Sequence, residues 1–272
     1  MEAIYTKARA RVNLNLAIIR KREDNYHDIK SVFQKINLYD ELWITKTKTN
    51  QIEISTNVEE LNGEENIIYK AYKKLQEKSK KVTGIKVKLK KNIPMQAGLA
   101  GGSADCANFL LAMNQLFGLQ LSQKEIEKIG KSLGADVVPC LYNKAVLVEG
   151  IGDKITPIQT NFKYYIVIIK PKISCNTQEM YQKIDEIEQQ KQPDNTKQMI
   201  QGLENKQIEK IAISLYNRFE EVMENKEEIQ QIKQEFKKQG AIRKFTNRVR
   251  FLYVWYICQQ RNCQNRLLCF KK

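Results

Sequence analysis

Residues 94–105 read Pro94-Met95-Gln96-Ala97-Gly98-Leu99-Ala100-Gly101-Gly102-Ser103-Ala104-Asp105. Before this stretch, residues 84–91 alternate apolar and basic side chains, which predicts a half-buried strand. After it, residues 104–114 place apolar side chains at helical spacing among good helix formers. The sequence therefore predicts a strand, a glycine-rich loop and a helix in direct succession.

The loop has the composition of a site for an anion. Gly98, Gly101 and Gly102 have no Cβ, so the backbone can approach a bound group closely. The amides at a helix N-terminus are unpaired and partly positive, which favours a phosphate. Ser103 can cap the helix, and its hydroxyl could equally face a phosphate or a metal ion. The alternative is a turn without a ligand, because the loop matches neither a Walker A sequence nor G-x-G-x-x-G.

The same stretch resembles a motif of the galactokinase, homoserine kinase, mevalonate kinase and phosphomevalonate kinase family, Pro-x-x-x-Gly-Leu-(Gly/Ala)-Gly-(Gly)-Ser-(Ser/Ala). The resemblance implies that residues 94–104 bind ATP. It also implies a two-domain α+β fold, with an N-terminal mixed α/β domain over residues 1–155 and a smaller ferredoxin-like domain over residues 156–272. The family's active site lies in the cleft between two such domains.

Three further segments resemble the branch of this family that phosphorylates 4-diphosphocytidyl-2-C-methyl-D-erythritol. They are residues 10–14 (Ala-Arg-Val-Asn-Leu), residues 22–27 (Arg-Glu-Asp-Asn-Tyr-His), and residues 134–137 (Gly-Ala-Asp-Val) followed by 149–152 (Glu-Gly-Ile-Gly). The resemblance implies transfer of the ATP γ-phosphoryl, with Mg²⁺, to the 2-hydroxyl of that isoprenoid precursor. Another small-molecule kinase of the family, or an inactive or nucleic-acid-binding relative, remains the alternative.

Two residues carry the implied chemistry. Asp136 resembles the family's catalytic aspartate, which receives the proton of the substrate hydroxyl. Arg11 stands where the family has a catalytic lysine, and a planar guanidinium cannot act as a compact point cation. We therefore expect a lower rate rather than none. Without the resemblance, Asp136 reads as an aspartate in a turn that ends a helix.

Five other positions resemble binding residues. Tyr26 and His27 resemble the pair that binds the cytidine base, and Asn13 resembles a residue of the substrate site. Asn66 and Lys91 resemble positions near the nucleotide. The alternatives are a structural histidine, a helix cap at Asn66 and a solvated strand charge at Lys91. No Cys or His spacing predicts a bound metal ion.

The remaining pattern mixes strands and helices at unequal spacing, which is typical of α+β folds. Strands are predicted at residues 8–18, 29–36, 41–47, 51–55, 145–150 and 164–169, with a turn at 37–40. Helices are predicted at residues 66–78, 122–133, 177–190, 207–223 and 226–239. Residues 122–125 (Ser-Gln-Lys-Glu) fit a capping box.

Composition narrows the class of protein. The chain is 42% apolar and 28% charged, as in globular proteins, and no apolar run approaches the roughly 20 residues that cross a bilayer. No signal peptide is recognisable, and the six cysteines form no Cys-x-x-Cys pair. We therefore expect reduced thiols in a cytoplasmic protein that binds no membrane. The sequence does not indicate an oligomeric state.

The net charge of +15 does not by itself indicate nucleic acid. Residues 243–272 contain eight Lys or Arg and no Asp or Glu, so about half of the excess lies there. The remaining basic residues are scattered among acids, and a basic cleft also suits phosphate-rich substrates. A small molecule is therefore the expected partner.

Residues 243–272 differ in composition from the rest and hold three of the six cysteines. The family's motif Thr-Gly-Ser-Gly-x-x-x-Phe-Gly is absent, but codons for residues 246–250 and 254–256 can spell it when the frame advances by one nucleotide. We therefore interpret this tail as a frameshifted reading that cannot pack as the family's last strand and helix. A genuine basic extension is the alternative.

Overall fold

A computed structural model describes residues 2–169, 177–187 and 194–223, single residues 227, 230, 231 and 234, and the strands at 244–246 and 254–258. The chain forms two compact units. The first contains Met1–Val12, Gln34–Val148 and Gly152–Ile155, and the second contains Asn13–Phe33, Glu149–Ile151 and Thr156–Lys272. The division into domains at residues 155 and 156 stays a prediction.

The first unit is built on a mixed sheet. Strands β1 (Ala3–Lys21), β2 (His27–Lys46), β3 (Ile52–Thr56) and β4 (Ile85–Lys90) lie in the order β3-β4-β2-β1. Strand β4 runs antiparallel to β2 and parallel to β3. Its apolar residues are buried and its lysines are exposed, which confirms the predicted half-buried strand.

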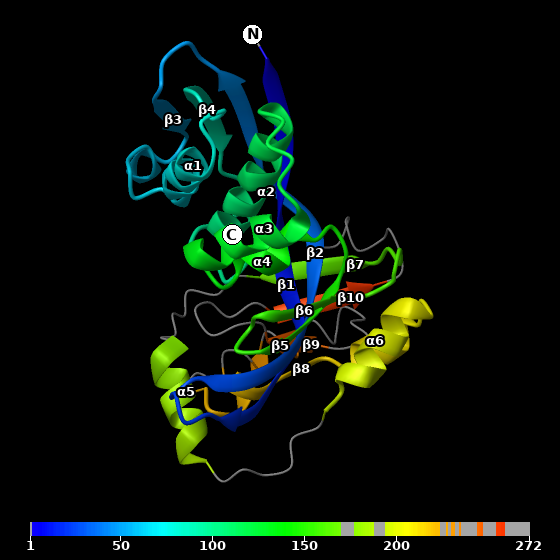
Figure 1. Cartoon of the computed structure of the whole chain (residues 1–272). Coiled ribbons are helices and arrows are strands. Elements are labelled where there is room, and N and C mark those ends of the chain that lie inside the picture. The colour runs from blue at the N-terminus through cyan, green and yellow to red at the C-terminus, as the bar shows by residue number, and fades with distance from the viewer. Residues whose placement is uncertain are drawn as a thin grey trace. The chain divides into compact units, whose positions relative to one another are not determined.

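Four helices of the first unit pack with this sheet into one hydrophobic core (Figure 1). They are α1 (Ile67–Lys78), α2 (Gly101–Leu116), α3 (Gln123–Leu133) and α4 (Val137–Leu141). Helix α1 buries Ile68, Ala71, Tyr72 and Leu75, which lie at helical spacing on one face. Helix α3 begins with the predicted capping box between Ser122 and Glu125.

One predicted turn is wrong. The segments at residues 29–36 and 41–47 belong to the single strand β2, which runs through residues 37–40. Asp40 is fully buried there, and its carboxylate accepts hydrogen bonds from the backbone amides of Asn92 and Ile93. The polar residue Asp40 is therefore part of a buried hydrogen-bond network within the strand and does not mark a turn.

Two short strands continue the chain, β5 (Val146–Gly150) and β6 (Lys154–Pro157). Strand β5 pairs with β2 and with β6. The sequence predicts β5 but not β6, because β6 has only four residues and no clear alternation. Helix α4 is likewise too short to show a helical period.

The second unit contains further short elements (Figure 1). They are β7 (Tyr165–Ile169), α5 (Thr177–Glu186), α6 (Thr196–Glu204), α7 (Ile208–Ile213), β8 (Tyr216–Asn217), the 3₁₀ helix η2 (Arg218–Glu221), β9 (Lys244–Thr246) and β10 (Val254–Cys258). Strand β8 pairs in parallel with β1, and Asn15 lies opposite Tyr216.

The predicted helix over residues 207–223 is present only in its first part, and its extent is wrong. Helix α7 ends at Ile213, and the chain then forms β8 and η2. The side chain of Asn217 accepts a hydrogen bond from the backbone of Phe219, which competes with a continuous helix. The predicted strand at 164–169 is present as β7, but Tyr165 is 38% exposed rather than buried.

The predicted helix at residues 226–239 lies largely outside the described residues. Strand β10 pairs with β7 along all five of its residues, from Val254 opposite Ile169 to Cys258 opposite Tyr165. The tail therefore contains a paired strand, whereas the interpretation that it cannot pack as the family's last strand and helix stays a prediction. Within the described residues, no helix combines the length and apolar character of a membrane span.

Candidate active site

The glycine-rich loop connects β4 to α2, as the sequence predicts. Gln96, Gly98 and Ala100 have positive φ angles of 51°, 65° and 55°. The left-handed conformation of Ala100 turns the chain into α2, so the helix begins at Gly101. The prediction that Ser103 caps this helix is wrong, because Ser103 already lies in the first helical turn.

The start of α2 offers its amides to a ligand. Ala100 occupies the N-cap position and makes no side-chain hydrogen bond to the helix. The first amides of a helix have no intrahelical partner, so they remain donors with a partial positive charge. A Cβ added at Gly102 would meet no atom within 4 Å, so there is open space beside this backbone. Free amides at the start of a helix are suited to an anion such as a phosphate.

The loop is tied to strand β1 next to a buried ion pair. The backbone amide of Arg11 donates a hydrogen bond to the carbonyl of Leu99, at 3.1 Å. The Arg11 side chain, 1% exposed, donates through its guanidinium to Oδ1 of Asp136 at 2.6 Å. The Asp136 side chain is 26% exposed. The structure thus brings together three predicted site elements: the loop, Arg11 and Asp136.

Asp136 occupies the N-cap position of α4 and makes no side-chain cap bond. Its carboxylate is therefore not used to cap α4. Cys140, in the same helix, is a buried free thiol. Burial raises the pKa of Cys140 to about 11, against the opposing effect of the nearby Arg11 cation. Cys140 therefore stays a neutral thiol at pH 7 and does not compete with Asp136 as a charged group.

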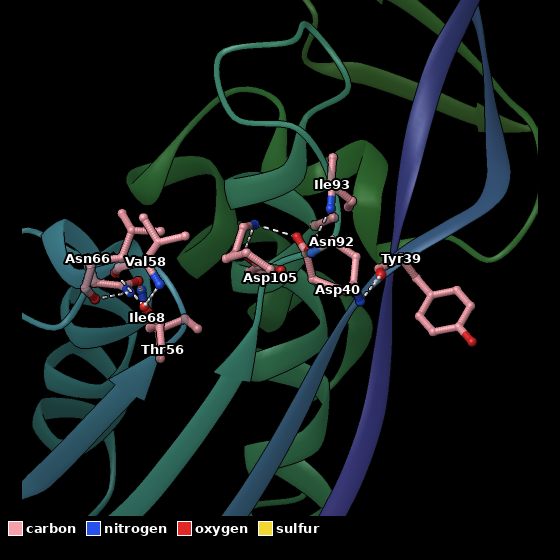
Figure 2. Close-up of polar contacts among 12 residues, drawn as sticks. Tyr39, Asp40, Thr56, Val58, Asn66, Ile68, Asn92, Ile93 and Asp105 are labelled. Atoms are coloured by element: carbon pink, nitrogen blue, oxygen red, sulfur yellow. Dashed lines mark hydrogen bonds and ion pairs between the residues drawn. The ribbon is translucent and has the colours of Figure 1, made fainter. Parts of the chain in front are cut away.

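Asn66 makes internal contacts (Figure 2), and so does Lys91. Asn66 is the N-cap of α1: its Oδ1 accepts from Ile68 at 2.9 Å and its Nδ2 donates to the carbonyl of Leu61 at 2.7 Å. The Lys91 side chain is 6% exposed and its ammonium contacts the carboxylates of Asp40 and Asp105. The alternative of a solvated lysine is therefore wrong, and binding of ATP by either residue stays a prediction.

The predicted cytidine-binding residues lie in the second unit. The Tyr26 side chain is 63% exposed, whereas Asn13 is buried in β1. The His27 ring stacks on Tyr181 with ring centroids 4.6 Å apart, and its Nε2 lies 2.7 Å from Oδ1 of Asp185. An exposed aromatic ring beside an oriented imidazole could bind a flat base.

Three carboxylates that contact predicted site residues were not themselves predicted. Asp40 and Asp105 contact Lys91, and Asp185 contacts His27. Burial acts to raise the pKa of Asp185, but hydrogen bonds from Lys21 and His27 outweigh it and lower the pKa below its ordinary value. Asp185 therefore stays charged and orients His27. The signal for Asp105 is visible in the sequence, because a charged residue inside an apolar helical segment must be paired when it is buried.

Several known proteins are similar in sequence to this chain over most of its length. A model of the GHMP kinases N terminal domain matches residues 66–144. A protein of Caldicellulosiruptor saccharolyticus named 4-diphosphocytidyl-2-C-methyl-D-erythritol kinase is 40% identical over 220 residues, which are 80% of this chain and 76% of that protein. A protein of the same name from Clostridioides difficile is 38% identical over 249 residues, 89% of this chain and 82% of that protein.

The chain belongs to the 4-diphosphocytidyl-2-C-methyl-D-erythritol kinase family. The family that the sequence motifs predicted is therefore confirmed, and so is the enzyme class, an ATP-dependent phosphotransferase. A crystal structure of a 4-(cytidine 5'-diphospho)-2C-methyl-D-erythritol kinase superposes with a TM-score of 0.78 at 22% identity, covering 97% of this chain and 93% of that one. The predicted α+β kinase fold of the family is confirmed as well.

The chain differs at two places from the pattern that the family resemblance implies. Arg11 pairs with Asp136 where the family resemblance implies a lysine. Residues 243–272 carry no Thr-Gly-Ser-Gly segment.

Proposed function

We propose that this kinase transfers the γ-phosphoryl group of ATP to the 2-hydroxyl of 4-diphosphocytidyl-2-C-methyl-D-erythritol, a step of isoprenoid precursor synthesis. The substrate is the one in the name of relatives that are 36–40% identical. The observation that carries the proposal is the ion pair between Arg11 and Asp136. The backbone amide of Arg11 also donates a hydrogen bond to the carbonyl of Leu99, in the glycine-rich loop. A proton acceptor and a cation beside a phosphate site are what phosphoryl transfer to an alcohol requires.

The proposal assigns a chemical role to the loop, to Asp136 and to Arg11. Residues 94–104 hold the ATP phosphates, through the free backbone amides of the loop and of the first turn of α2, and Asp136 receives the proton of the attacking hydroxyl. Arg11 orients the Asp136 carboxylate and adds positive charge next to the transferred group. Mg²⁺ would enter the site bound to ATP and would neutralise part of the charge on the phosphates. Among the described residues there is no group of three or more His, Cys, Asp or Glu that could hold a metal ion.

Recognition of the substrate is assigned to the second unit. Tyr26 would stack on the cytosine ring, and His27, oriented by Asp185, would meet its polar edge. Asn13 would donate or accept a hydrogen bond at the substrate. The reaction would take place in the cytoplasm, where the free thiols of Cys106 and Cys140 stay reduced.

The proposal is tested by measuring ADP release by the purified full chain with ATP and Mg²⁺. Three acceptors are compared: 4-diphosphocytidyl-2-C-methyl-D-erythritol, homoserine and mevalonate. We expect turnover with the first alone. Replacing Asp136 by Asn should lower kcat by about 10²- to 10⁴-fold, the usual contribution of a general base, while circular dichroism stays unchanged.

Asp153→Asn is the matched control, because Asp153 is a surface aspartate paired with Lys131. This variant should keep the parent kcat. Turnover of homoserine or mevalonate but not of the cytidyl compound would contradict the proposed substrate. An Asp136→Asn variant as active as the parent would contradict the proposed role of Asp136.

A further inference from the structure

A buried cluster of three charged side chains lies next to the glycine-rich loop. The proposed reaction does not use these side chains. We call Asp40, Lys91 and Asp105 the loop triad. Their side chains are 0%, 6% and 4% exposed. The Lys91 ammonium contacts Asp40 and lies 2.6 Å from Oδ2 of Asp105. Figure 2 shows Asp40 and Asp105 gathered here with Asn92 and Ile93.

The loop triad touches both ends of the loop. Asp40 Oδ1 accepts hydrogen bonds from the amides of Asn92 at 2.5 Å and Ile93 at 2.8 Å, immediately before the loop. Asp105 belongs to α2, immediately after the loop. A single ammonium therefore bridges the segment that enters the loop and the helix that leaves it. The ammonium also lies under the first residue of α2, since a Cβ added at Gly101 would be 3.3 Å from it.

The backbone of Lys91 is fixed independently. Its amide donates to Oδ1 of Asn57 at 2.7 Å, and its carbonyl accepts from Nδ2 of Asn57 at 3.0 Å. The side chain of Asn92 donates to the carbonyl of Tyr39 at 3.0 Å. The entrance of the loop is therefore held at successive residues, and the ammonium has no freedom to leave its two carboxylates at low cost.

Stability alone does not explain such a cluster. Charges buried in a protein cost desolvation free energy, and apolar replacements of similar volume are often as stable. Burial raises the pKa of Asp105 well above its ordinary value, and Oδ1 of Asp105 has no hydrogen-bond partner in the structure. What the cluster provides is geometry, because each contact is directional and fixes one end of the loop.

We propose that the loop triad positions the phosphate-binding loop, so that Lys91 acts on ATP binding through the loop and does not touch ATP. The inference rests on the proposed function of the loop. It reassigns Lys91 from a nucleotide ligand to a positioning residue, and it adds Asp40 and Asp105 to the residues on which ATP affinity depends. Loss of the triad should weaken ATP binding and leave the cytidyl substrate unaffected.

The deciding variant is Asp40→Asn, because it keeps the shape and the acceptor oxygen of the side chain but removes the charge that holds Lys91. We expect the KM for ATP to rise at least tenfold, with kcat within threefold and the KM for the cytidyl substrate within twofold of the parent. Lys91→Met should give the same pattern, and the double variant should be no worse than the worse single variant. Lys90→Met, at an exposed neighbour, should change nothing.

If Lys91 binds ATP directly, Lys91→Met raises the KM for ATP while Asp40→Asn does not, which overturns the proposal. Should Asp40→Asn fail to fold, Asp105→Asn takes its place with the same expected results. Hydrogen exchange of the amides of residues 95–104 without nucleotide gives a readout that needs no activity. We expect faster exchange in the triad variants than in the Lys90→Met control, and equal exchange overturns the positioning role even if the chain proves not to phosphorylate the proposed substrate.

Discussion

The Arg11 side chain is only 1% exposed. Arginine is almost never fully buried unless it is paired, and Arg11 is paired with a carboxylate. Its partner Asp136 lies 125 residues away in the sequence, at 2.6 Å from the guanidinium. A guanidinium remains charged at any physiological pH and binds a carboxylate in a fixed geometry. We infer that this pair holds the carboxylate more rigidly, and with less room for a third group, than a lysine would.

Replacing Arg11 by Lys should therefore increase turnover. A compact ammonium can contact both Asp136 and a transferred phosphoryl group, which the planar guanidinium does less well. We expect kcat to rise by up to about tenfold, equivalent to about 1.4 kcal/mol of barrier. Steady-state assays with saturating ATP and cytidyl substrate measure it. The control is Arg9→Lys, at an exposed position of the same strand, and an Arg11→Lys variant without any gain would contradict our explanation.

At the scale of the element, α2 begins earlier than its sequence predicts because of one backbone conformation. Ala100 adopts φ 55° and ψ 34°, a left-handed conformation that non-glycine residues adopt at a cost of about 1–2 kcal/mol. This conformation places Gly101 and Gly102 inside the helix and leaves its first amides uncapped. The strain and the uncapped helix start occur at the place where the phosphate would bind.

Replacing Ala100 by Gly should relieve this strain. We expect the free energy of unfolding to rise by about 0.5–1 kcal/mol, since the greater entropy of glycine in the unfolded chain offsets part of the gain. Urea unfolding measures it. Ala104→Gly, four residues later in the regular helix, should instead destabilise by about 1 kcal/mol or more. Destabilisation by both substitutions would show that Ala100 is not strained.

The start of α3 gives a prediction that depends on pH. Hydrogen bonds from the backbone and side chain of Ser122 lower the pKa of Glu125 from 4.5 to about 2. A lowered pKa in the folded state stabilises the fold above the unfolded-state pKa, and this stabilisation is lost as the pH falls toward the folded-state pKa.

Replacing Glu125 by Gln should therefore destabilise the protein at pH 7, and the difference from the parent should shrink between pH 4.5 and about 2. Thermal unfolding at a series of pH values measures it. Glu127→Gln on the same helix is the control, and a Glu125→Gln effect that is constant over this range would contradict the assignment.

At the scale of the whole molecule, strands β1 and β2 contribute residues to both compact units. The tail also belongs to the second unit, where β10 pairs with β7 and with β9. This pairing uses backbone groups, which every residue other than proline supplies in full. It is therefore compatible with a tail whose sequence departs from that of the family.

The frameshift interpretation predicts that a chain whose reading frame is advanced by one nucleotide at codon 243 contains Thr-Gly-Ser-Gly. Because the family resemblance places this segment beside the active site, the restored chain should turn over the cytidyl substrate faster than the chain as written. Sequencing the genomic 3′ end and assaying both chains decides it. A genomic sequence in which no one-nucleotide shift restores the motif would contradict the interpretation.

The sequence by itself determined the elements that depend on neighbouring residues. The alternation in β4, the apolar face of α1, the capping box at Ser122 and the glycines of the loop all act over a few residues, so their patterns can be read directly. The order of short motifs also determined the family. These signals were enough to place Asp136 and Arg11 among the candidate catalytic residues.

Only the tertiary structure decided which polar side chains are buried together. The sequence predicts Asp40 in a turn and Lys91 either near the nucleotide or as a solvated charge. In the structure the two side chains form an ion pair across 51 residues, at the start of the loop. Likewise, Asp185 meets His27 across 158 residues. Burial makes an isolated charge unfavourable and a paired one acceptable, and the partner is chosen by the packing of distant elements. No local pattern carries that information.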